Sequence, residues 1–98
     1  MVEINWTHRS VNDLKNIFDY ISYDSKRYAE RQIKKIQQRA QILKSFPDVG
    51  SQVKEVDQND IKQLVEGPYR IIYKKISDQR IDILTIHHSK QNLDPEKL

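Results

Sequence analysis

Residues 67–93, GPYRIIYKKISDQRIDILTIHHSKQNL, carry the strongest strand signal in the chain. Two runs rich in Ile and Tyr, 69–76 and 80–88, flank the turn Ser77-Asp78-Gln79. These residue types fit a pleated, half-buried surface, and Gly67-Pro68 fits the entry to a strand. The stretch therefore predicts a β-hairpin.

Both faces of this hairpin contain apolar residues, because side chains alternate between faces along a strand. The first strand would place Tyr69, Ile71 and Tyr73 opposite Arg70, Ile72, Lys74 and Ile76. The second would place Ile81, Ile83, Thr85 and His87 opposite Asp82, Leu84, Ile86 and His88. Since neither face is wholly polar, we expect two inner strands of a sheet that is covered on both sides.

The 98 residues predict a single domain spanning 1–98, with one modest core. There is no Cys, which excludes disulfides, thiolate metal sites and Cys nucleophiles and suits a reducing compartment. No apolar run approaches the ~20 residues of a membrane span, and the first residues lack a signal-peptide pattern. We therefore expect a cytoplasmic protein without membrane contact.

The rest of the chain predicts an α+β fold. Val2–Trp6 reads as a short strand, with the single Trp in the core. Apolar residues at helical spacing predict a helix over 11–23, capped by Ser10 with Thr7 as the competing cap. The same spacing predicts a second helix over 26–45, capped by Asp24 or Ser25. Weaker strand signals cover 51–56 and 61–66, and 93–98 reads as a loose tail.

The expected order is a strand, two helices and then three or four strands, with β-α-α-β-β-β as its core, and it groups the helices together and the strands together. Such a grouping favours an antiparallel sheet with a helical hairpin packed on one face. Each helix has only one apolar stripe, so the pair must lay those stripes on the sheet.

Basic and imidazole side chains gather at the end of the predicted hairpin, namely Arg70, Lys74, His87, His88 and Lys90. Arg and Lys stabilise a phosphate or its transition state, and His moves protons near neutral pH. Such a set can cleave RNA without a metal ion, and it can equally hold an acidic partner. A structural role remains open for His87 at the strand end and for Arg70, whose candidate ion-pair partners are Glu55, Glu66 and Asp82.

We expect neither a metal site nor a phosphate-binding loop. His87 and His88 are adjacent, so on a strand they point to opposite faces, and His8 is distant in sequence. Gly50 and Gly67 are the only glycines, too few for a Gly-rich loop.

The segment from Lys26 to Lys44 holds seven basic residues against one acid, Glu30. A basic helix of this kind is either a solvated face or a surface for nucleic acid or an acidic protein. On the second interpretation the partner-binding residues would be Arg27, Arg31, Lys34 and Lys35, together with Arg70, Lys74 and His88.

In its order of short motifs the chain resembles the RelE/ParE superfamily of bacterial toxins, most closely the ParE branch. The motifs are Asp13-Leu14, Ile17…Tyr20-Ile21, Leu43…Phe46-Pro47…Gly50, Tyr69-Arg70-Ile71-Ile72-Tyr73 and Ile83-Leu84-Thr85-Ile86-His87-His88. The resemblance covers nearly the whole chain and implies the toxin of a type II toxin–antitoxin module, neutralised by a cognate antitoxin and needing no cofactor.

Two activities occur in that superfamily, and the resemblance implies one of them. ParE-like members inhibit DNA gyrase by protein–protein contact, which is the activity we expect. RelE-like members are ribosome-dependent ribonucleases that cut messenger RNA; here the catalytic residues would be Arg70, His87, His88 and Lys90. An inactive homologue that only binds its antitoxin is a third hypothesis.

Overall fold

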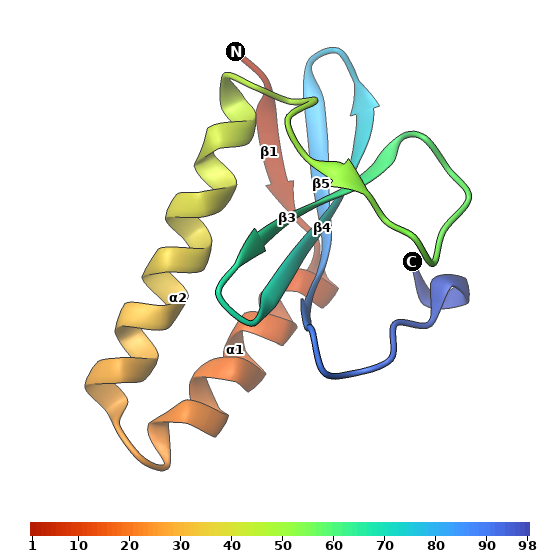
Figure 1. The fold of residues 1–98 in the computed structure, drawn as a ribbon. Helices are drawn as coiled ribbons and strands as arrows, with labels where there is room; N and C mark the ends of the chain where they lie inside the picture. Colours follow the sequence, from red (N-terminus) through yellow and green to blue (C-terminus); the bar gives the residue numbers. More distant parts are fainter.

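The computed structural model describes residues 1–98 as a sheet with two helices on one side (Figure 1). In chain order the elements are β1 (Glu3–Trp6), α1 (His8–Ser22), α2 (Lys26–Gln41), a 3-10 turn (Ile42–Lys44), β2 (Ser51–Gln52), β3 (Ile61–Glu66), β4 (Tyr69–Ser77), β5 (Arg80–His88) and a 3-10 turn (Pro95–Lys97). The predicted α+β class, the helical hairpin and the β4–β5 hairpin are confirmed.

The five strands follow the order β1-β5-β4-β3-β2, so β4 and β5 are inner strands as predicted. All neighbours are antiparallel except β1, which runs parallel to β5 from Glu3↔Arg80 to Trp6↔Ile83. The predicted antiparallel sheet is therefore confirmed for β2–β5, and β1 adds a parallel strand at one edge. Parallel strands need a long connection, and α1, α2 and the later strands provide it.

A β-bulge at Leu84 changes which side chains share a face. Ile72 pairs with Thr85, but the next residue of β4, Tyr73, pairs with Ile83. Leu84 is therefore an extra residue, and the simple alternation predicted for β5 is wrong beyond it. Ile86 lies on the face of Ile81 and Ile83, whereas the prediction had placed it opposite them.

Two separate clusters of buried side chains lie on the two faces of the sheet. The helix-side cluster has twelve buried residues, contributed by Val2 just before β1, α1, α2, the 3-10 turn after α2, and β3–β5. The loop-side cluster has five, namely Val53, Val56, Ile61, Ile72 and Leu93. The segment 53–60 and the chain after His88 cover this second face, where Leu98 also packs. Two residues of the predicted tail, Leu93 and Leu98, thus pack on this face of the sheet.

Local polar contacts fix the ends of the helices. Thr7 caps α1, since its hydroxyl oxygen accepts from the Ser10 N–H at 3.1 Å and its O–H donates to the Ile83 carbonyl at 2.7 Å. Ser10, the predicted cap, instead lies inside the first turn, fully buried, with its O–H donated to the Thr7 carbonyl. Ser25 caps α2. Neither α1 nor α2 combines the length and apolar character needed to span a bilayer.

Candidate functional site

Arg70 is held by a loop residue on the face of the sheet opposite the helices. Its guanidinium donates to both carboxylate oxygens of Glu55, at 2.8 and 3.0 Å, and its Nε donates to the Gln63 side chain at 2.6 Å. These hydrogen bonds hold the pKa of the Glu55 carboxyl below its usual value. The Arg70 side chain is only 14% exposed, so it anchors the 53–60 segment to β4.

His87 and Lys74 lie on the same face as Arg70 and are also engaged. His87 pairs with Arg70 across the two strands and is buried. Its Nε2 donates to the Gln91 carbonyl at 2.8 Å, because a carbonyl can only accept. The Lys74 ammonium lies 3.7 Å from Asp60. The sequence predicted these residues as part of one cluster, and the structure gives each of them a partner within the chain.

His88 is separated from Arg70 by the sheet itself. His88 turns to the helix side, where its ring meets the Tyr69 ring edge-on with centroids 5.4 Å apart. Its Nδ1 accepts from the backbone N–H of Lys90 at 3.1 Å, and the Lys90 side chain is exposed. The four residues proposed for RNA cleavage therefore do not face a common point.

A pocket of about 540 Å³ opens beside His88, and the sequence gave little sign of it. We call it the His88 pocket; α1, the start of β4, the end of β5 and the following turn line it with Asp13, Asn16, Ile17, Tyr20, Tyr69, Ile86, His88 and Gln91. Its one carboxylate, Asp13, accepts from the Ile86 N–H at 3.1 Å and from the Thr85 hydroxyl. The one signal in the sequence was Tyr20, an aromatic residue outside the apolar stripe of α1. In the structure its side chain is 80% exposed.

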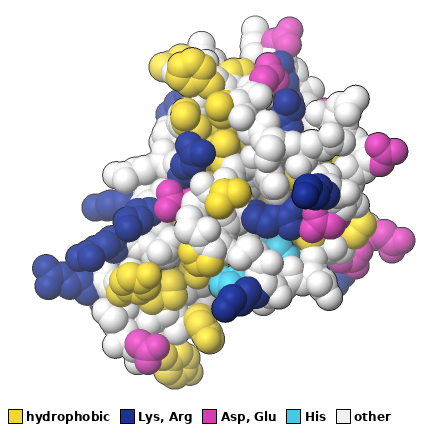
Figure 2. Space-filling model, in the orientation of Figure 1, with side chains coloured by type: hydrophobic (Ala, Val, Ile, Leu, Met, Phe, Trp, Pro, Cys, Tyr) yellow, Lys and Arg dark blue, Asp and Glu magenta, His cyan; other side chains and the backbone are white.

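The basic residues of α2 form an exposed row without acidic partners. Figure 2 shows Lys and Arg side chains following the edge that α2 forms. Arg27, Arg31, Lys34 and Lys35 are exposed, and the five salt bridges of the protein all involve β4, β5 or the loops instead. The free cations give this side of the molecule a positive potential that attracts an anionic partner.

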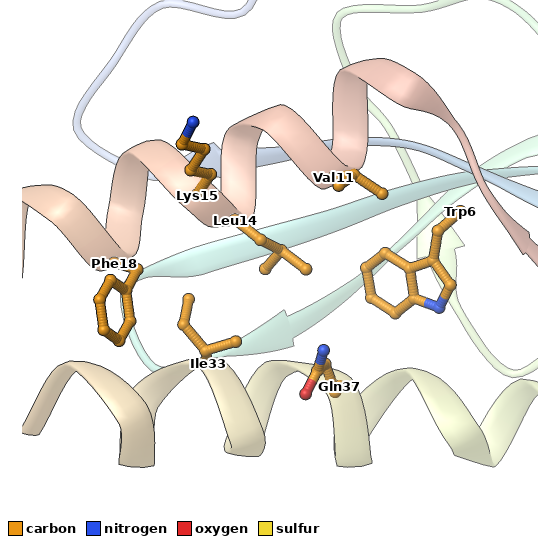
Figure 3. Close-up of a pocket in the computed structure, with 7 residues that line it drawn as sticks. All are labelled: Trp6, Val11, Leu14, Lys15, Phe18, Ile33 and Gln37. Carbon is orange, nitrogen blue, oxygen red and sulfur yellow. The ribbon is translucent and has the colours of Figure 1, made fainter. Parts of the chain in front are cut away.

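A second pocket, about 450 Å³ in volume, lies between the two helices and is mainly apolar (Figure 3). In Figure 3 Val11 and Leu14 of α1 face Ile33 and Gln37 of α2, with Trp6 at one end and Phe18 at the other. Val11 is 53% exposed at its rim. We call this the interhelix groove. No group of three or more His, Asp or Glu side chains lies close enough to share a metal ion.

Residues 4–93 match the model of the ParE toxin of the type II toxin–antitoxin system parDE. The Toxin RelE2 of Caulobacter vibrioides is 28% identical over 89 residues, which is 91% of this chain and 97% of that protein. The solved structure of the chromosomal ParDE system from P. aeruginosa superposes with a TM-score of 0.76 at 19% identity, covering 92% of this chain and 98% of that one. The structural match shows a shared fold.

The family match covers most of the chain, which therefore belongs to the ParE toxins of type II toxin–antitoxin systems. The toxin class expected from the sequence motifs is confirmed. A cognate antitoxin is the partner that this class implies.

Proposed function

We propose that this toxin inhibits DNA gyrase by protein–protein contact, and that the antitoxin neutralises it by covering the contact surface. The observation that carries the proposal is the interhelix groove, an apolar depression lined in part by α2, the helix that also carries the unpaired cations. An apolar pocket that accepts an anchor side chain, surrounded by charges that guide the encounter, is the usual anatomy of a protein-binding surface.

The residues on the face of the sheet opposite the helices support a contact mechanism rather than catalysis. A nuclease of the alternative kind needs free cations and an imidazole directed at one phosphate. Arg70 is instead saturated by Glu55 and Gln63, and His87 is buried against Gln91. His88 lies across the sheet from both.

The test is the supercoiling of relaxed plasmid by purified gyrase with increasing toxin. The wild-type chain should inhibit it, and Val11→Asp should weaken inhibition by about tenfold or more, because the charge enters the groove where an anchor would bind. Asp is tolerated near the N-terminus of a helix, so α1 should remain folded. Val49→Asp is the matched control, since Val49 is 50% exposed in a loop outside the groove. Unchanged supercoiling at saturating toxin would reject the proposal.

A ribosome-dependent ribonuclease is the second candidate, favoured by one observation. The similar protein from C. vibrioides is named Toxin RelE2, and the activity in question is that of RelE-like toxins. The same preparation should then cut messenger RNA on translating ribosomes without affecting gyrase. Toxin that affects neither reaction would identify an inactive homologue that binds only its antitoxin.

A further inference from the structure

We propose that the His88 pocket binds a base of single-stranded nucleic acid, while the cations along α2 bind the phosphates next to it. The inference stands apart from the gyrase contact, because it concerns a different pocket and needs no enzyme to be measured. The two proposals share only the basic row of α2, which here would contact phosphates.

The lining of the pocket suits a flat, partly polar ring. Tyr20 contributes an exposed aromatic ring, and the buried Tyr69 together with Ile17 and Ile86 gives the pocket apolar walls. The side-chain amides of Asn16 and Gln91 supply both hydrogen-bond donors and acceptors. Stacking of a base on an aromatic side chain is the main attraction in single-strand binding, and edge hydrogen bonds add to it.

The charge inside the pocket favours a base over a phosphate. Asp13 is the only carboxylate that lines it, and no Lys or Arg does. A phosphate at this point would be repelled by Asp13. A neutral base meets no such penalty, so the anionic part of the ligand has to lie outside the pocket.

The cations outside the pocket lie across the turn of the helical hairpin. Tyr20 stands near the end of α1, which stops at Ser22, and α2 begins at Lys26 and packs against α1, so Tyr28 lies at the start of the neighbouring helix. Arg31 and Lys35 follow Tyr28 at spacings of three and seven residues, so they lie on the same side of α2. All three side chains are exposed.

This combination selects nucleic acid over an acidic peptide. A peptide joins an anion to a ring only where an acidic and an aromatic residue are neighbours, so its fit depends on its sequence. A nucleotide chain carries one phosphate per base, which matches a ring-binding pocket beside a row of free Arg and Lys. DNA and RNA share this chemistry.

The experiment measures fluorescence anisotropy of labelled oligo-dT and oligo-rU of about 12 nucleotides, and of a duplex of the same length, with the 98-residue toxin. We expect both single strands to bind more tightly than the duplex, and the tighter one identifies DNA or RNA as the source. Tyr20→Ala should weaken single-strand binding about tenfold. Arg31→Ala should reduce the slope of log affinity against log salt by about 0.7.

Tyr23→Ala is the control for the pocket, since Tyr23 is a 92% exposed tyrosine of the same hairpin but does not line it. Its affinity should stay within about twofold of wild type. The proposal would be overturned if the Tyr20 and Tyr23 variants lost equal affinity for the oligonucleotides, or if the wild type did not bind them at low salt. Tyr20→Ala that weakens gyrase inhibition but leaves oligonucleotide binding intact would show that the pocket takes a protein side chain instead.

Discussion

The two faces of the sheet are covered in different ways. On one face α1 and α2 cover a cluster of twelve buried residues. On the other, the 53–60 segment and the tail cover only five. The comparison teaches that one face provides most of the stability, while the other is closed by irregular chain that a few contacts hold in place. Arg70 and His87 lie under that thinner cover.

Adjacent residues of β4 allow the sharpest test of this difference. Ile71 and Ile72 are both fully buried, but Ile71 belongs to the helix-side cluster and Ile72 to the loop-side cluster. Ile71→Ala should lower the free energy of unfolding by about 4 kcal/mol and Ile72→Ala by about 2, because loops relax into a cavity more easily than packed helices. Urea denaturation of both variants checks this, and an equal or reversed order would contradict the comparison.

Gly50 lies where the chain passes from the helix side into the loop-side cover. Its N–H donates to the Tyr73 hydroxyl at 3.0 Å, and a Cβ there would lie 2.4 Å from that oxygen and 2.7 Å from the Gln63 carbonyl oxygen. Gly50→Ala should therefore lower the free energy of unfolding by about 3 kcal/mol. Gly67, at φ 56°, has open space around it, so Gly67→Ala should cost only about 1. Thermal unfolding of the pair measures both, and equal costs would contradict the crowding at Gly50.

Arg70 tests whether the thinner face is structural or functional. Arg70→Ala leaves Glu55 and Gln63 without their donor and should cost about 2 kcal/mol. Glu55→Gln should cost less, since Gln can still accept from Arg70. Chemical denaturation gives these values. The folded fraction of Arg70→Ala should inhibit gyrase as wild type does; lost inhibition with intact folding would assign Arg70 to the site.

The smallest expected effect is the pH dependence of the same ion pair. Arg70 lowers the pKa of Glu55 below its ordinary value of 4.5, so the stabilisation is complete above that value and is lost as the pH falls through the lowered pKa. Between about pH 5 and pH 3 the wild type should lose up to about 1 kcal/mol more than Glu55→Gln, because the partly exposed pair is screened by solvent. Denaturation of both proteins at each pH measures this difference. If wild type and Glu55→Gln lose the same free energy of unfolding over this range, the ion pair makes no such contribution.

The sequence predicted the regular half of this molecule well. The apolar spacing of α1 and α2, and the Ile- and Tyr-rich runs of β4 and β5, encode burial with a fixed period, and both pairs of elements are confirmed. The bulge at Leu84 was not predictable, because an inserted residue resembles its neighbours in composition. The Thr7 cap was decided by a contact with Ile83, which no local pattern contains.

The site was less predictable, because the contacts that define it also join residues that are far apart in the sequence. Sequence grouped Arg70 with His88, but the sheet separates them once the residues are paired. Glu55 was one of three candidate partners, and only the path of the 53–60 segment selects it. Val53 and Val56 lie in a stretch that was predicted as a weak strand over 51–56, but β2 ends at Gln52, so the cover that they form was not apparent.

The central claim is that the toxin acts through its helical hairpin. The most direct test compares how strongly wild type, Val11→Asp and Arg70→Ala inhibit supercoiling by gyrase, with equal amounts of folded protein. The account predicts that Arg70→Ala matches wild type and that Val11→Asp needs about ten times more protein for the same inhibition. Loss of inhibition in Arg70→Ala with full activity of Val11→Asp would contradict it and would place the functional surface on the opposite face.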